Sequence, residues 1–330
     1  MDISFFSSEH DPNDPRACAA LVVFELDAFG ALAVVWEDFE FVYMNQPYIA
    51  GFLAFREVPH LRLLLERLRA SHPDLMPEVI LLDGNGVLHP RGFGCASHFG
   101  VVCDVVCIGI AKNLHMIDGL DRNDIRKRME AVGTGGHVPL IGSSGRVWGA
   151  ALLPDPPDRK ALKHVKTDAK NPIFVSVGHR ISLETSLAIA NLCCVCRREP
   201  EPTRIADMRS REIVRQAKAL RSAFDLLKAM SAEVSDVSEA EVQHLKKALQ
   251  DARSVVTDKD LLKPVNRVLT LLESGSQANQ TKFHTARTEA LAKIAPALGP
   301  PLPEKTGIVT PLCFVMGLGI AAILLRRFAR

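Results

Sequence analysis

The sequence lacks an excess of charge of either sign. Its 40 Lys and Arg residues stand against 38 Asp and Glu residues, which leaves a formal net charge of +2. A protein-wide attraction for polyanions is therefore excluded, and any surface that binds nucleic acid must be a local patch. Wholesale disorder is excluded too, because 47% of the residues are hydrophobic and 24% are charged. A chain of 330 residues can bury a substantial core and form more than one unit.

An apolar signal region at the N-terminus is also missing. The eight cysteines lie at uneven spacings, unlike the frameworks of disulfide-rich secreted domains. We therefore expect an intracellular protein with reduced thiols. Cys193, Cys194 and Cys196 fall in a predicted helix, without the second ligand pair that a zinc site needs. Buried packing of these small thiols is the favoured interpretation.

The N-terminal third has the pattern of β-strands. Apolar and β-branched runs cover Asp2–Phe6, ten residues from Ala17, and Leu32–Tyr43, and Pro, Asn, Asp and Gly separate them. Short connections between successive strands favour an antiparallel meander.

A change of period follows at Phe55, where apolar residues recur at helical spacing. A strand ending at Asp83, a helix that holds His98, and a further strand DVVCIGI come next. Strands are also predicted at 147–153 and 173–177, and a helix from Ser182. This order predicts an α/β fold, a ribonuclease H-like mixed sheet flanked by helices.

Residues 213–298 form a series of amphipathic helices, with breaks near Ser235, Thr257 and Gly275. The run from Ile308 to Leu325 is uncharged and precedes three arginines. About 18 largely apolar residues are at the lower limit for crossing a bilayer, so a hydrophobic tail helix acting as a membrane anchor is favoured over a core helix. We predict a nuclease-like domain at 1–215, a helical extension at 216–304 and this tail at 305–330.

Acidic residues mark the ends of the predicted strands and the start of the first helix. Asp2, Glu57 and Asp83 supply three oxygen ligands of the kind that Mg²⁺ or Mn²⁺ prefers, and such an ion assists phosphodiester hydrolysis. If the first and fourth strands are adjacent, Asp2 and Asp83 share one ion. Taken singly, Glu57 is also explained as a helix N-terminal acid and Asp83 as a turn former.

Six segments occur in the order found in one nuclease family: MDISF, PYIAGFLAFRE, DGNGVLHPRGFGCASH, IGIAKNL, FVSVGHRISLETS and EPTRIADMRSRE. On these segments, from Met1 to about Glu212, the chain resembles endonuclease V, which cuts nucleic acid near inosine. Members of that family normally carry further residues before the first aspartate, so we expect an N-terminally shortened form whose first strand lacks part of its ladder.

The resemblance implies an active site with a supporting acid, Asp207. Its metal ligands are Asp2, Glu57 and Asp83, and its further catalytic residues are His89, Lys112 and His179. His98 is interpreted as a packing histidine. Arg209 and Arg211 are explained equally by phosphate contacts and by solvated helix charges.

The resemblance also implies a pocket for the inosine base. Its wedge is Tyr48, in the loop Pro47–Gly51, because a stacked base must be extruded before it can be read. The remaining pocket residues are small or apolar, although the glycines among them are also explained by tight turns: Gly51, Leu53, Gly84, Cys95, Gly109 and Ala111.

The resemblance therefore implies a Mg²⁺-dependent endonuclease, with Mn²⁺ as a substitute, that cleaves at the second phosphodiester 3′ of inosine and leaves a 5′-phosphate and a 3′-hydroxyl. Similarity to animal-type members favours RNA, with single-stranded or damaged DNA as the alternative. We expect a cytoplasmic or nuclear location, or tail-anchoring to an intracellular membrane. Two other functions stay open: an inosine-RNA-binding protein impaired in cleavage, and a membrane-tethered adaptor.

Overall fold

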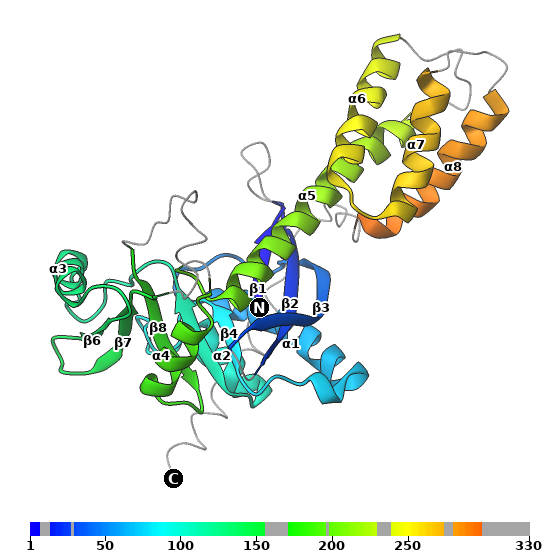
Figure 1. Cartoon of the computed structure of the whole chain (residues 1–330). Helices are drawn as coiled ribbons and strands as arrows, with labels where there is room; N and C mark the ends of the chain where they lie inside the picture. The colour runs from blue at the N-terminus through cyan, green and yellow to red at the C-terminus, as the bar shows by residue number, and fades with distance from the viewer. Residues whose placement is uncertain are drawn as a thin grey trace. The chain divides into compact units, whose positions relative to one another are not determined.

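The computed structural model describes residues 1–6, 14–27, 30–155, 171–195, 198–229, 239–273 and 280–298. Its N-terminal part is a three-stranded sheet (Figure 1). The strands pair in sequence order and antiparallel, so the predicted meander is confirmed: β1 (Asp2–Phe5), β2 (Arg16–Leu26) and β3 (Leu32–Tyr43).

Strand β2 is buried on both faces. Ala19 and Leu21 pack into a core with α1 (Leu53–Ser71), whereas Cys18 packs on the other side against Val214 and Ala217 of α5 (Glu201–Ala229). This double cover explains why the strand reads as a continuous apolar run. It also fixes α5 on the face of the sheet opposite α1.

A second sheet has five strands in the order β4-β5-β8-β7-β6. Only β4 and β5 are parallel, and α2 (Cys95–Cys103) lies between them in the sequence. The strands are β4 (Ile80–Asp83), β5 (Cys107–Ala111), β6 (His137–Ile141), β7 (Val147–Leu152) and β8 (Ile173–His179).

Met1 joins the two sheets. Its amino group donates to the Leu81 carbonyl at 3.1 Å, and its carbonyl accepts from the Asp83 amide at 3.3 Å. β1 and β4 are therefore neighbours, as the hypothesis of a shared ion requires. Asp2 and Asp83 lie next to each other at this junction.

The segment from Arg122 to Ile141 was not predicted as regular structure. It forms α3 (Arg122–Val132) and the edge strand β6. The Asp121 side chain caps α3 by accepting hydrogen bonds from the amides of Asn123 and Asp124.

The prediction for the cysteine-rich helix needs a correction. Ser182 caps α4 (Leu183–Leu192) as expected, but the helix ends before Cys193 and Cys194. Both thiols are buried in a hydrophobic core, so the packing interpretation is confirmed for these two. Cys196 lies outside the described residues.

The C-terminal helices form a bundle with its own apolar core. Helices α6 (Glu239–Val255), α7 (Lys259–Glu273) and α8 (Gln280–Ala297) pack with the second half of α5. The predicted break near Thr257 is confirmed, whereas those near Ser235 and Gly275 lie outside the described residues. The predicted domain boundary after residue 215 falls inside α5, which continues without interruption.

The predicted tail helix at 308–325 lies outside the described residues. Within the part of the chain that is described, no helix has the length and hydrophobicity needed to cross a membrane. The anchor therefore stays a prediction.

Candidate active site

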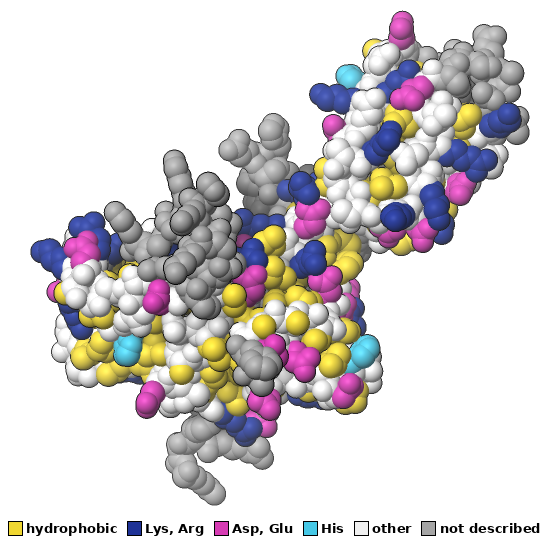
Figure 2. Space-filling view, in the orientation of Figure 1, with side chains coloured by type: hydrophobic (Ala, Val, Ile, Leu, Met, Phe, Trp, Pro, Cys, Tyr) yellow, Lys and Arg dark blue, Asp and Glu magenta, His cyan; other side chains and the backbone are white. Residues whose placement is uncertain are grey.

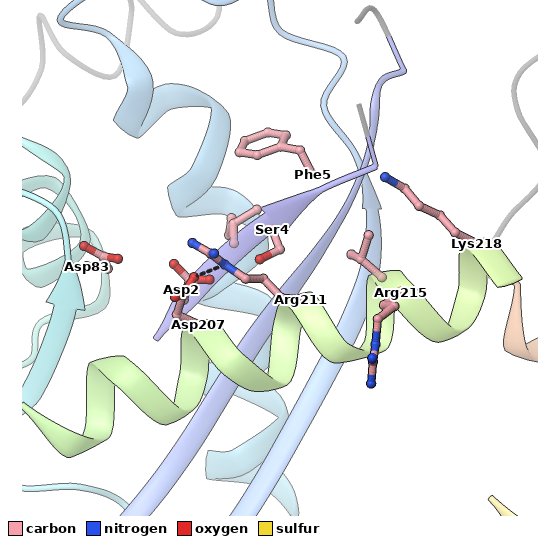
Figure 3. Close-up of a pocket in the computed structure, with 10 residues that line it drawn as sticks. Asp2, Ser4, Phe5, Asp83, Asp207, Arg211, Arg215 and Lys218 are labelled. Atoms are coloured by element: carbon pink, nitrogen blue, oxygen red, sulfur yellow. Dashed lines mark hydrogen bonds and ion pairs between the residues drawn. The ribbon is translucent and has the colours of Figure 1, made fainter. Parts of the chain in front are cut away.

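A pocket of about 530 Å³ opens between β1, the end of β4 and the middle of α5. Three carboxylates line it, each from a different element: Asp2, Asp83 and Asp207. Figure 3 shows Asp2 and Asp207 close together beside Arg211, with Asp83 at the end of the neighbouring strand. The structure thus gathers two of the predicted metal ligands with the predicted supporting acid.

Lys112 is the cation shared by this acidic group. It directly follows β5, whose carboxyl end lies beside that of β4 because the two strands are parallel. Its Nζ lies 3.2 Å from Asp83, 3.6 Å from Glu199 and 3.8 Å from Asp207, measured to a carboxylate oxygen of each. Although burial lowers it, these carboxylates raise the pKa of Lys112 above its ordinary value. Lys112 is thus held protonated at the pocket.

Two buried serines hold Asp2 in place. The Ser210 hydroxyl donates to Asp2 Oδ2 at 2.7 Å, and Ser4 Oγ lies 2.7 Å from Ser210 Oγ. Burial nevertheless raises the pKa of Asp2, and the carboxylates of Asp83 and Asp207 act in the same direction. The end of the pocket around Asp2, Asp83 and Asp207 therefore concentrates negative charge.

Sequence reasoning did not find Ser4, Ser210 or Glu199. A usable signal existed for Ser210, because a residue three positions after Asp207 on a helix shares its face. Ser4 lies two positions after Asp2 on a strand, which also gives a common face. Glu199 precedes α5, and no local pattern relates it to Lys112.

Glu57 lies on α1, close enough to the other acids to feel their charge. Its Oε2 accepts a hydrogen bond from the Cys95 thiol, with a sulfur–oxygen distance of 3.6 Å. Burial raises the pKa of Glu57 to about 7, with further contributions from Asp2 and Asp83. The predicted acidic triad is therefore electrostatically coupled.

The residues fit a hard divalent cation in ligand type and charge. Oxygen ligands predominate: Asp83, Glu199 and Asp207 lie at Lys112, and Asp2 and Glu57 lie close enough to Asp83 to feel its charge. Among the described residues, however, no group of three or more His, Cys, Asp and Glu side chains is close enough to hold an ion. Asp83 and Asp207 contact Lys112 instead, and Asp2 contacts Ser210. The ligand set stays a prediction.

The two predicted catalytic histidines lie in different places. His89 is buried and accepts at Nδ1 from the Arg91 amide at 3.2 Å; burial, with the nearby charges of His115 and Arg91, lowers its pKa. His179 pairs with Cys107, at the end of β5 opposite to Lys112. Its Nδ1 lies 3.0 Å from the Val105 carbonyl. The predicted position of His179 near the metal is therefore wrong, because β8 runs antiparallel to β5.

His98 packs against aromatic rings, as predicted. Its ring lies 4.8 Å from that of Phe55 and 5.8 Å from that of Phe93, centroid to centroid. Burial lowers the pKa of His98. These contacts account for the residue without a catalytic role.

The predicted wedge is free to meet a base, since Tyr48 is 68% exposed. Gly51 follows with φ +79°, and its carbonyl accepts from Arg91 Nη1 at 3.1 Å. The Arg91 guanidinium also stacks 3.8 Å from the Phe52 ring centroid. The loop is thus pinned at its end while the tyrosine stays accessible.

The other predicted base contacts surround the turn after β4. A side chain at Gly109 would come within 2.7 Å of the Gly84 carbonyl and 2.3 Å of the Gly86 amide, so close backbone packing requires glycine there. Cys95 and Ala111 are buried, and Leu53, the first residue of α1, is partly buried. A base contact by these residues stays a prediction.

The family model of endonuclease V matches residues 1–208. The chain belongs to the endonuclease V family. It is 47% identical to mouse (Mus musculus) endonuclease V over 218 residues, covering 66% of this chain but 59% of the mouse protein. Identity to the human (Homo sapiens) protein is 45% over 223 residues, covering 67% of this chain and 72% of that protein.

Solved structures of endonuclease V agree with the fold. The crystal structure of the human protein matches with a TM-score of 0.57 and 44% identity, covering 66% of this chain and 83% of that one. Endonuclease V of Ciona intestinalis, solved with a 24mer DNA containing an inosine followed by a ribo-adenosine, matches with a TM-score of 0.55 and 35% identity; the coverage is 64% and 82%.

The endonuclease V model ends inside α5. It includes the pocket carboxylates and Lys112, but it stops before Ser210 and before the basic residues that follow on the same helix. The helical bundle lies entirely beyond the matched range.

Proposed function

We propose that this protein is a divalent-metal-dependent endonuclease that cleaves RNA at the second phosphodiester 3′ of inosine, with single-stranded DNA as a second substrate. One observation carries the proposal: carboxylates from β1, β4 and α5 converge on one pocket, and Lys112 contacts those from β4 and α5. Such a convergence of acids and one protonated amine suits the cleavage of a phosphate ester.

In the proposed reaction, water attacks phosphorus, the bond from phosphorus to O3′ breaks, and the products carry a 5′-phosphate and a 3′-hydroxyl. Lys112 offsets negative charge on the phosphate, and its contacts with Asp83 and Asp207 hold the ammonium group at the pocket. Ser210 orients the Asp2 carboxylate. A divalent ion bound by Asp2, Glu57 and Asp83 would supply Lewis-acid stabilisation and a more acidic water.

Selection of inosine is assigned to the wedge loop. The exposed Tyr48 ring fills the place of an extruded base, and the pinned Gly51 end limits the movement of the loop. The complex of the Ciona protein with inosine-containing DNA supports this substrate class. The ribo-adenosine next to its inosine supports a substrate with a ribose on the 3′ side.

The test uses the full chain and two labelled RNA strands that differ only in one inosine or adenosine. We expect a single cut in Mg²⁺ or Mn²⁺ at the second linkage 3′ of inosine, none in the adenosine strand, and none with excess EDTA. Binding that depends on inosine without any cut would favour the inosine-RNA-binding alternative. If the protein neither binds nor cuts the inosine strand, the membrane-tethered adaptor is the remaining alternative.

A further inference from the structure

The pocket continues from its acidic end into a row of basic side chains. Arg211, Arg215 and Lys218 line the same cavity as the carboxylates, and their spacings of four and three residues place them on one face of α5 (Figure 3). About 16 Å of helix separates Asp207 from Lys218 at 1.5 Å per residue. The cavity thus has an acidic end and a basic end.

Packing fixes this part of α5 against the sheet. Ser210 bonds to Asp2, and Val214 and Ala217 are buried against Phe6 and Cys18. The basic side chains alternate with these buried positions and stay in water: the Arg211 and Arg215 side chains are 69% and 62% exposed. Their place along the pocket is therefore set by the core beneath them.

The basic residues are held only loosely by their protein partners. Arg211 pairs with Asp207 and Arg215 with Glu212, each within one helical turn at the surface. In each pair the guanidinium is exposed and the carboxylate is partly buried. The exposed guanidinium groups keep donors that face water and can also contact a phosphate. Lys218 makes no ion pair with any described residue. Charge is therefore available for an anionic ligand.

The opposite wall of this groove is the edge of β1. Residues 3–5 of β1 line the cavity and pair with β2. The hydrogen bond from the Asp83 amide at the end of β4 goes to Met1, before these residues. The Arg56 guanidinium lies 5.4 Å from the Phe5 ring centroid. On the face shown in Figure 2, Lys and Arg side chains are interspersed with Asp and Glu side chains. Along the α5 side of this cavity, three basic side chains follow Asp207 in sequence.

We propose that this groove, defined by Ile3–Phe5, Arg211, Arg215 and Lys218, binds the sugar–phosphate backbone of the substrate strand beside the cleaved linkage. Arg215 and Lys218 each contact one phosphate, a few nucleotides from the bond that is cut. The idea rests on the proposed function for the position of that bond. Backbone contacts of this kind orient a strand without reading its bases.

The first experiment measures binding of the inosine and adenosine strands over a range of salt concentrations, in Ca²⁺ to suppress cleavage. Arg215→Ala/Lys218→Ala should lower affinity for both strands about tenfold and reduce the salt slope by about 1.4, from roughly 0.7 per phosphate contact. The ratio of inosine to adenosine affinity should not change. The control Lys228→Ala/Arg253→Ala removes two exposed charges outside the pocket and should leave the slope unchanged.

The second experiment places one neutral methylphosphonate at a time along the strand. The wild type should lose affinity at two positions where the double variant loses none, which is the signature of direct contact. The proposed groove would be refuted if the double variant had the salt slope of the wild type. It would also be refuted if each methylphosphonate lowered the affinity of variant and wild type equally. Equal affinity of the wild type for the inosine and adenosine strands would instead count against the proposed function. The salt slope would still show whether the groove contacts phosphates.

Discussion

The nuclease fold and the helical bundle are built on opposite principles. The bundle core contains only Leu, Ala, Val, Phe and Ile. Every buried polar or charged residue that the structure describes lies at or before Ser210, and every exposed large hydrophobic one lies at or before Met208. One region therefore satisfies the simple rule of apolar inside and polar outside, and the other breaks it in both directions.

This difference indicates where the chemistry lies. Burying carboxylates costs free energy unless partners offset it, and exposing aromatic rings wastes apolar surface. The nuclease fold contains both features: Asp2 and Glu57 are carboxyl groups whose burial raises their pKa, and Tyr48 is an exposed ring. The described residues of the bundle include no buried carboxylate and no exposed aromatic ring of this kind.

The strongest test of this contrast removes one acid from each region. Asp83→Asn should lower the cleavage rate by about a hundredfold or more, because it deletes a charge that the reaction requires, while binding of an inosine strand is retained. The matched control is Asp251→Asn, which changes an exposed side chain on α6 and should leave the rate unchanged. Single-turnover rates in Mg²⁺ decide the matter, and near-normal turnover by Asp83→Asn would refute the site.

A cavity in each core tests whether the regions can be separated. Leu249→Ala in α6 and Leu68→Ala in α1 both empty a fully buried position and should each cost about 2–5 kcal/mol. We expect the bundle variant to lose hydrogen-exchange protection in α6 to α8 yet keep its cleavage rate. Equal loss of protection across the nuclease fold would show that the two cores unfold as one.

The buried acid Glu57 gives the nuclease fold a pH dependence. Its pKa of about 7 is raised from an ordinary 4.5, so the ionised form is disfavoured in the folded state. The metal-free protein should therefore lose stability as pH rises from about 4.5 to 7, and Glu57→Gln should remove that loss. At pH 8 in EDTA we expect the variant to be more stable by on the order of 1–3 kcal/mol.

Urea denaturation at pH 5 and pH 8 measures this effect. Glu239→Gln, in the exposed first turn of α6, is the control and should change stability by less than about 0.5 kcal/mol at either pH. If Glu57→Gln shifts stability equally at both pH values, burial of the charge is not the cause.

The smallest expected effect concerns the exposed rings. Tyr48→Ala should weaken inosine binding by about 1–3 kcal/mol and reduce discrimination against adenosine. Phe39→Ala, which removes a 46% exposed ring from β3, should do neither. The measurement is the affinity for matched inosine and adenosine strands. If Tyr48→Ala leaves the ratio of these two affinities unchanged, Tyr48 does not act as the wedge.

Local patterns predicted most of the elements that carry the site. The bounds of β3 agree at both ends, since its turn signals are strong, and Asp2 and Asp83 were placed correctly because strand ends are visible in the sequence. The α3–β6 segment was missed although Asp121 and Gly133 mark the ends of the helix. β6 is a short edge strand that contains Pro139, which weakens its strand signal.

Errors at the site arose where direction or distance in the sequence mattered. His179 was misplaced because the periodicity of a strand does not give its direction, and β8 is antiparallel. Glu199 reaches Lys112 from 87 positions away in the sequence, so only the folded chain relates them. The cysteine pair was assigned to α4 because no Gly or Pro marks the end of that helix.

The hydrogen bond between Asp2 and Ser210 also determines when the site can form during synthesis of the chain. Its partners are 208 residues apart, which makes it one of the least local contacts in the fold. At about 5–20 residues per second, a ribosome adds Ser210 roughly 10–40 s after Asp2. Throughout that interval Asp2 lacks the hydroxyl that orients it, and Glu199 and Asp207 are added only near its end. A nascent chain therefore cannot assemble the pocket next to the messenger RNA that encodes it until synthesis has passed α5.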